Sequence, residues 1–423
     1  MSFPALQRRL GLGDAVSLGL GSMIGAGVFA VWAPAAQAAG SALLIGLVIA
    51  AVVAFANATA SAQLAAAHPT SGGTYAYGRA ELGPWWGFTA GWAFVIGKTA
   101  SCAAMAMTFA AYAAPSGWER PTAIAAVVAL TATNLLGITR TALLTRIIVV
   151  VVLIVLAIAV GGAVAAPDAE GWLVGVPQPD GGAAGLMYGV LQSAGLLFFA
   201  FAGYARIATL GEEVRDPRRT IPRAIVVAFA AAVVVYAVIG VAVLSTLGPA
   251  ATAASSEPVA AAAAAGWGWT GPIVRVGAAA ASLGALLALI TGVGRTAFAM
   301  AREGDLPRAL SAVHPTRSVP HRAELVLAVV VIALIATIDL RGAIGFSSFG
   351  VLLYYLVANA AAWRQRGDAR RYPRVLQIVG AIGCLVLAVT LPWQSVAAGT
   401  AVVAAGIAYR MLRMRRSSRA PLG

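Results

Sequence analysis

The stretch Gly19-Leu20-Gly21-Ser22-Met23-Ile24-Gly25-Ala26-Gly27-Val28-Phe29 places four glycines in an otherwise apolar run. A second apolar run, Phe198-Phe199-Ala200-Phe201-Ala202-Gly203-Tyr204-Ala205-Arg206, carries a glycine at a comparable place. Glycine destabilises a helix and permits unusual backbone dihedral angles. Both runs therefore predict interrupted helices, with the interruptions at about 23–27 and 200–204.

The composition places these runs in a membrane protein. Of the 423 residues, 60% are hydrophobic and 10% are charged, and the mean hydropathy is +0.86. A soluble chain carries about 25% charged residues, and a disordered chain has low hydrophobicity. The two cysteines, Cys102 and Cys384, both lie in apolar runs, which excludes a secreted disulfide scaffold. We therefore expect an all-α integral membrane protein.

Apolar runs bounded by charged or turn residues divide the chain into about twelve spans, since a spanning helix needs about 20 apolar residues. The predicted spans are 14–38, 42–66, 85–114, 121–137, 143–166, 185–210, 221–247, 270–300, 323–339, 343–363, 373–389 and 392–411. We expect a single transmembrane domain, 1–423. Repeat one would cover about 14–166, repeat two about 185–363, and two further helices about 373–411.

The arginines predict the orientation. With a cytoplasmic N-terminus, 23 arginines lie in cytoplasmic segments and three lie outside, namely Arg120, Arg275 and Arg341. This distribution follows the positive-inside rule and places both termini in the cytoplasm. It also argues against nucleic acid as the partner of the +14 net charge, because the charges occupy short loops between apolar runs. The expected environment is the cell membrane.

Interrupted segments at matching places in two halves point to a transporter built on an inverted repeat. The helix that restarts after the first break offers free N–H groups and a positive dipole end, which suit a carboxylate. Helices that stop at a break offer carbonyls to an ammonium group. An α-amino acid carries both groups. The competing interpretation is that small residues such as those at 21–27 serve tight helix packing.

Three motifs resemble those of the amino acid–polyamine–organocation (APC) superfamily of permeases. GSMIGAGVF at 21–29 is similar to its G-S-x-I-G-x-G-I/V-F signature. FFAFAGYARIATLGEEVRDPRRTIPRAI at 198–225 resembles its sixth helix and following loop, and GRTAFAMAREGDLPRAL at 294–310 resembles its eighth-helix end. The resemblance covers nearly the whole chain. It implies a LeuT-like fold of two inverted five-helix repeats, with discontinuous first and sixth helices and two added helices, and transport by alternating access.

Carried over residue by residue, the resemblance assigns a substrate site without a metal or cofactor. The carbonyl near Ile24, the glycine Gly25 and the N–H groups of Ala26 and Gly27 would hold the amino and carboxylate groups. Phe199, Ala202 and Gly203 would supply backbone contacts from the sixth span. Phe201 and Tyr204 are candidate gates, with aromatic packing as the alternative role.

The sequence also departs from the family. Many relatives carry an acid after the aromatic residue of the sixth-span motif, where this chain has Ala205. Many proton-coupled relatives place a lysine in span five, in place of a sodium ion, and the alignment puts Val152 there. The usual proton-coupling residue is therefore missing or relocated.

The only lysine, Lys98, lies deep in span three. A charge in mid-membrane costs at least ~2.5–3.5 kcal/mol and usually faces a cavity or a partner. Lys98 is therefore a candidate for coupling or for charge selectivity; the alternative is a structural lysine capped by carbonyls of a broken helix. Arg206, just after the sixth-span break, is a second such candidate.

These observations predict a secondary active transporter that moves an amino acid across the cytoplasmic membrane, proton-coupled or by exchange. A carrier of polyamines or other amines and a non-transporting membrane receptor of the same fold are the alternatives. No nucleophile–base–acid or metal-ligand set lies within the spans, so we expect no enzyme. The sequence leaves the oligomeric state open.

Overall fold

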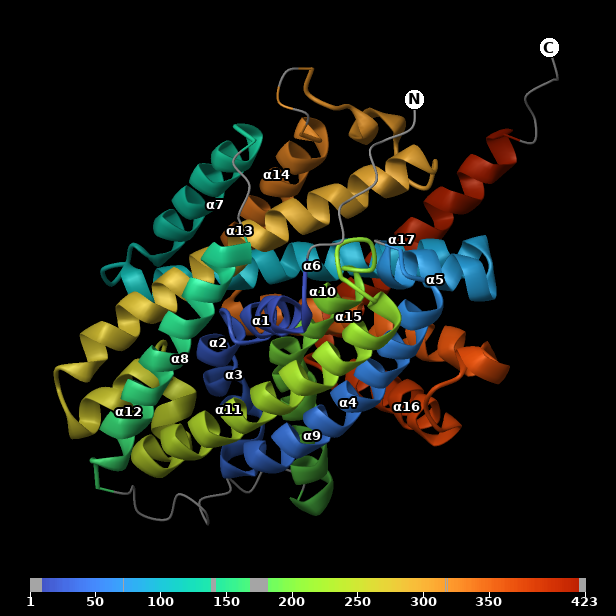
Figure 1. Ribbon diagram of the computed structural model, residues 1–423. Coiled ribbons are helices and arrows are strands. Elements are labelled where there is room, and N and C mark those ends of the chain that lie inside the picture. Colours follow the sequence, from blue (N-terminus) through green and yellow to red (C-terminus); the bar gives the residue numbers. More distant parts are fainter. Residues whose placement is uncertain are drawn as a thin grey trace.

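A computed structural model describes residues 10–70, 72–137, 142–167, 182–315, 317 and 319–417 (Figure 1). The orientation argument also used Arg8, Arg9, Arg140 and Arg419, which lie outside the described residues. Within the described ranges the regular structure is helical, apart from one isolated parallel bridge between Leu10 and Val214. This agrees with the predicted all-α integral membrane protein.

The described residues of the first half of the chain include eight α-helices. They are α1 (Leu12–Met23), α2 (Gly27–Ala30), α3 (Trp32–Ala39), α4 (Leu43–Ala67), α5 (Gly73–Leu82), α6 (Pro84–Ala113), α7 (Glu119–Leu135) and α8 (Ala142–Val164). The predicted first span, 14–38, is thus divided into three helices. The predicted third span, 85–114, forms one helix that begins with Pro84 at its first position, where the missing N–H costs nothing.

The described part of the second half contains nine more. They are α9 (Gly182–Phe201), α10 (Ala205–Ala208), α11 (Pro217–Ala254), α12 (Pro258–Gly266), α13 (Thr270–Arg302), α14 (His321–Thr337), α15 (Leu340–Arg364), α16 (Arg374–Thr390) and α17 (Trp393–Ser417). Short 3₁₀ helices cover Gly40–Ala42, Ala202–Tyr204, Arg308–Ser311 and Gly367–Ala369. Within α11, Gly248 has φ +71°, so the regular helix ends close to residue 247, where span seven was predicted to end.

Nine segments of the described chain are long and apolar enough to cross a membrane. They are Leu12–Ala30, Trp32–Ala67, Pro84–Ala113, Thr145–Val164, Gly182–Ala208, Pro217–Ala254, Thr270–Arg302, Leu340–Arg364 and Trp393–Arg415. The spans predicted at 121–137, 323–339 and 373–389 fall on α7, α14 and α16, which have 17 residues each. At 1.5 Å per residue such a helix is about 26 Å long, against a hydrocarbon core of about 30 Å. The count of twelve and the two-repeat division stay predictions.

The helix α1 occupies the middle of the bundle, where it contacts α8, α10 and α11 (Figure 1). The neighbouring α6 packs against α13 and α15. Outer helices instead turn apolar side chains outward; on α8, for example, Ile147, Val150 and Ile154 are each at least half exposed. Such side chains suit contact with lipid. The glycine-rich first helix is thus packed against other helices along one side, where Ala15, Gly19 and Met23 are buried.

Candidate substrate-binding site

The first helix break lies at Ile24, Gly25 and Ala26, between α1 and α2. The helix α1 ends as the N–H of Ile24 donates to the carbonyl of Leu20 at 2.7 Å, and the next helix restarts at Ala26, whose carbonyl accepts from Ala30. The N–H groups of Gly25, Ala26 and Gly27 donate to no backbone carbonyl within the described residues. The interruption falls inside the predicted range 23–27, and it leaves donors free at the start of a helix.

The second break is a single turn of 3₁₀ helix, Ala202–Tyr204, between α9 and α10. It falls inside the predicted range 200–204, but the chain there tightens and does not unwind into an extended segment. A 3₁₀ turn replaces the i→i−4 hydrogen bonds with i→i−3 bonds and commonly marks a hinge. The carbonyl of Ala202, the first residue of this turn, accepts a hydrogen bond from the Tyr355 hydroxyl at 3.3 Å.

The two breaks touch each other through backbone atoms. A Cβ on Gly203 would lie 2.3 Å from the Ser22 carbonyl oxygen, and one on Gly27 would lie 2.9 Å from the Cα of Ala200. The Tyr236 hydroxyl of α11 lies 2.6 Å from the Met23 oxygen and 2.9 Å from the Ala200 oxygen, so its one proton can be donated to either carbonyl. The structure therefore brings together the residues that the sequence analysis named from spans one and six. That analysis did not identify Tyr236.

The side chains named for this region are packed tightly. Ile24, Ala26, Phe199 and Ala202 are buried, and Gly203 is half-buried. Phe201 is fully buried and packs edge-to-face on Tyr236 at 4.9 Å between ring centroids. Its contacts favour the packing role over the gating role, since both rings belong to the α9–α11 contact.

Tyr204 lies in a different setting. Its ring stacks on Tyr355 of α15 at 5.0 Å and meets Phe229 of α11 edge-on at 6.3 Å. The ring thus bridges the second break to two helices that do not follow it directly in the chain. Its hydroxyl has no hydrogen-bond partner of ordinary geometry in the described structure.

Lys98 is buried within α6, with 8% of its surface exposed. Its neighbours on the helix fix its face: Gly97 lies against Gly350 of α15, and Ser101 shares a 2.6 Å hydrogen bond with Ser347. About four turns farther along the Lys98 side of α6, Tyr112 donates to the carbonyl of Phe29 in α2 at 3.3 Å. The described structure gives Lys98 neither an ion pair nor a hydrogen bond. Lys98 is thus a buried lysine without a polar partner, on a part of α6 that packs against α15.

A small cavity opens beside the first break. Its volume is about 20 Å³, enough for one water molecule, which needs about 10–15 Å³. The lining residues are Gly21, Ile24, Gly25, Thr145, Ile148, Val149, Val152, Ala281, Gly284 and Ala285. Val152 thus borders the break where relatives were expected to place a lysine, and no side chain in the lining carries a charge.

Comparison with known proteins decides the family. The family model described as amino acid permease matches residues 10–414. The chain belongs to the amino acid permease family. It is therefore a transporter of the APC superfamily and a multi-pass membrane protein, as the three motifs indicated.

Three relatives show the range of this family. An uncharacterized transporter of Mycobacterium tuberculosis is 57% identical over 404 residues, covering 95% of this chain and 90% of the relative. The branched-chain amino acid permease BcaP of Bacillus subtilis is 25% identical over 447 residues, covering 98% and 95%. The methylthioribose transporter of Bacillus subtilis is 27% identical over 380 residues, covering 84% and 81%.

In this permease, Arg206 is exposed and lies within electrostatic reach of Glu213 and Arg295. Arg295 is also close enough to Glu324 for an electrostatic interaction between their charges. The side chain of Glu324 is only 2% exposed and packs against Gly294 of α13. The Oε2 atom of Glu324 has no hydrogen-bond partner among the described residues. Sequence reasoning missed Glu324, although an acid one residue inside an apolar span was a usable signal.

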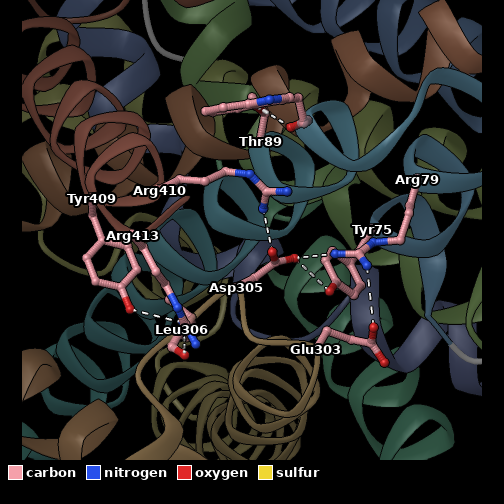
Figure 2. Close-up of polar contacts among 10 residues, drawn as sticks. Tyr75, Arg79, Thr89, Glu303, Asp305, Leu306, Tyr409, Arg410 and Arg413 are labelled. Atoms are coloured by element: carbon pink, nitrogen blue, oxygen red, sulfur yellow. Dashed lines mark hydrogen bonds and ion pairs between the residues drawn. The ribbon is translucent and has the colours of Figure 1, made fainter. Parts of the chain in front are cut away.

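A polar network at the arginine-rich side of the permease centres on Asp305, just after α13 (Figure 2). The carboxylate accepts from the Tyr75 hydroxyl at 2.9 Å, from Arg79 at 2.7 Å and from Arg410 of α17. Burial, and then the charge of Asp305, raise the pKa of the Tyr75 phenol well above its usual value, so the phenol keeps its proton and donates. The motif at 294–310 thus ties α13 to α5 and α17.

Asp14, in the first turn of α1, also forms an ion pair with another helix. It pairs with Arg146 of α8. Beside it, Leu10 exchanges two backbone hydrogen bonds with the segment before α11, from its own N–H to Glu213 and from Arg215 to its carbonyl. These contacts hold the start of α1 against the segment that follows the second break.

Proposed function

We propose that this permease is a secondary active transporter that carries an amino acid across the cytoplasmic membrane by alternating access. The observation that supports this best is the meeting of two helix breaks, with free N–H donors at Gly25, Ala26 and Gly27. A carboxylate suits those donors and the adjoining helix start. The printed name of BcaP, a relative over nearly the full length, adds support for an amino acid.

The proposal includes a topology. Both termini lie in the cytoplasm, and the breaks belong to equivalent helices of two repeats, about 14–166 and 185–363. The ends that carry most arginines, among them the starts of α11, α14 and α16, would face the cytoplasm.

The substrate class separates this proposal from its nearest alternatives. A carrier of polyamines would not need the carboxylate donors, and the buried Lys98 disfavours a dication near the breaks. The methylthioribose transporter shows that a relative's substrate need not be an amino acid. A receptor of this fold would bind its ligand but move nothing.

A thermal-shift screen of the purified protein tests the substrate class. The probes are the proteinogenic amino acids, their methyl esters, polyamines and methylthioribose. A ligand at 100-fold its dissociation constant adds about 2.7 kcal/mol to the free energy of unfolding, enough to raise the melting temperature measurably. We expect stabilisation by one or more free amino acids and none by their esters. Equal stabilisation by ester and acid would contradict a carboxylate site at the first break.

Coupling is proposed to pass through Lys98. Its amine would gain and lose a proton as its surroundings change between the inward-facing and outward-facing states. Glu324 is the competing group, because it too is buried without a hydrogen-bonded partner for one oxygen. Exchange of one substrate for another would need neither residue to titrate.

A further inference from the structure

A cleft lies where α15 ends and α16 begins, far along the chain from either break. It encloses about 210 Å³ and is lined by Trp363, Arg364, Arg366 and Arg374. The volume is many times the roughly 10–15 Å³ that a single water requires, so a phosphate group with bound water has room there. Three of its four lining side chains are guanidinium groups.

The charges of this cleft are not balanced by the protein. None of its three arginines forms an ion pair within the described chain, and the nearby Asp368, on the connecting 3₁₀ turn, pairs with none of them. The one charge-related contact is that of Arg374, whose guanidinium lies 4.9 Å from the centre of the Trp363 ring. Three like charges around one cleft repel each other, and guanidinium groups bind phosphate oxygens in a bidentate manner. The cleft therefore suits an anionic oxygen ligand.

An apolar stripe leads away from the cleft along α16. Its residues are Val375, Ile378, Ile382, Leu385 and Val389, which are 44% to 65% exposed and recur at helical spacing on one face. Their span is about 21 Å, longer than the ~15 Å of hydrocarbon in one leaflet. Trp363, which is 40% exposed, stands at the head of the stripe, in the position of an interfacial tryptophan.

We propose that this cleft binds the phosphate of an anionic phospholipid, with its acyl chains along the α16 stripe. The lipid comes from the leaflet on the arginine-rich side, which the positive-inside rule assigns to the cytoplasm. A free phosphate ion has the same charged oxygen groups as the headgroup, but it has no acyl chains that could contact the apolar stripe. The site is separate from the substrate-binding region, so its test does not depend on transport.

The test measures lipid binding by native mass spectrometry and by thermal shift on the delipidated, purified chain. The probes are dioleoyl phosphatidylglycerol, dioleoyl phosphatidylcholine and inorganic phosphate. The variant is Arg364→Gln with Arg366→Gln and Arg374→Gln. The matched control is Arg223→Gln with Arg308→Gln and Arg322→Gln, which removes the same charge from exposed arginines on the same side. A triple lysine variant at the cleft retains the charge and checks that the site still folds.

We expect phosphatidylglycerol, and not phosphatidylcholine or phosphate, to raise the melting temperature of the wild type. The cleft variant should bind phosphatidylglycerol roughly a hundredfold more weakly, since each arginine near an anionic surface contributes about fivefold. The lysine variant and the control should keep most of the binding.

Three results would overturn the proposal. Equal loss of phosphatidylglycerol binding in the cleft variant and its control would show that the lipid responds to overall positive charge and not to this cleft. Stabilisation by inorganic phosphate as large as that by phosphatidylglycerol would assign the cleft to a soluble anion. A dimer in native spectra that retains no lipid and dissociates when the α16 stripe is made polar would assign the stripe to a second copy of the chain.

Discussion

At the scale of single residues, Tyr236 joins the two helix breaks more directly than any residue the sequence singled out. Its hydroxyl lies within hydrogen-bond distance of one carbonyl at the end of α1 and one near the end of α9. A tyrosine in an apolar span gives no signal of such a role, because the partners come from breaks about 36 and 213 positions away in the chain.

Replacing Tyr236 by phenylalanine should remove the one hydroxyl proton that lies within reach of both buried carbonyls. The expected cost is about 1–3 kcal/mol in the free energy of unfolding, with reduced uptake, because the breaks lose their shared anchor. The control is Tyr188→Phe on the exposed start of α9, which should change stability by less than about 0.5 kcal/mol. Thermal unfolding in detergent measures both; equal melting temperatures for the two variants would show that the bridge contributes nothing.

Substitutions of Lys98 test whether its amine carries the coupled proton. Lys98→Met removes the charge and keeps the length, so uptake should lose its dependence on external pH while the fold remains intact. Lys98→Arg should also impair coupling, since arginine keeps its proton in this pH range. Removing an unpaired buried charge should not lower the melting temperature.

The competing carrier of the proton is tested by Glu324→Gln in the same proteoliposome assay. If the pH profile survives Lys98→Met and disappears in Glu324→Gln, coupling passes through the α13–α14 contact and the role given to Lys98 is wrong.

At the scale of helices, the sequence predicted both interruptions to within a few residues, because glycine acts locally on backbone conformation. It did not predict their form. The second break is a 3₁₀ turn, since Gly203 lies against the Ser22 carbonyl and the chain must pass close by. The bend at Val31 between α2 and α3 also escaped prediction; there the Trp32 indole donates back to Val28 at 2.6 Å.

The glycines of the two breaks should tolerate substitution poorly. Gly203→Ala would force a methyl group to within 2.3 Å of a backbone oxygen. We therefore expect the free energy of unfolding to fall by about 1–3 kcal/mol, and uptake to decrease as well. Gly292→Ala in α13 has open space around it and should instead stabilise by about 0.5–1 kcal/mol. A lower melting temperature for Gly203→Ala and a higher one for Gly292→Ala would support close backbone contact between the two breaks. An unchanged melting temperature for Gly203→Ala would contradict that contact.

At the scale of the whole molecule, the Asp305 network joins segments that come from three distant parts of the chain (Figure 2). The sequence identified the motif at 294–310 by resemblance, but the partners Tyr75 and Arg410 become neighbours only through the fold. The same holds for Asp14, whose partner Arg146 lies on α8. Local patterns thus predicted elements and breaks, whereas the long-range polar contacts required three-dimensional structure.

Asp305→Asn should destabilise the permease by about 3–5 kcal/mol, because it leaves Arg79 and the nearly buried Arg410 without their shared carboxylate. Glu303→Gln removes a neighbouring charge that is 58% exposed and lies 3.4 Å from Arg79, so it should cost no more than about 1 kcal/mol. Thermal unfolding of both variants in one detergent gives the comparison. Equal losses would mean that the Asp305 network is no stronger than a surface ion pair.

The most direct test of the central claim is uptake of labelled amino acids into proteoliposomes that contain this chain alone, with and without an imposed pH gradient. We predict saturable uptake of at least one α-amino acid, competed by the unlabelled compound and abolished by Gly203→Val. Saturable uptake of methylthioribose or a polyamine with no amino acid carried, or binding of an amino acid without any uptake, would contradict the proposed function.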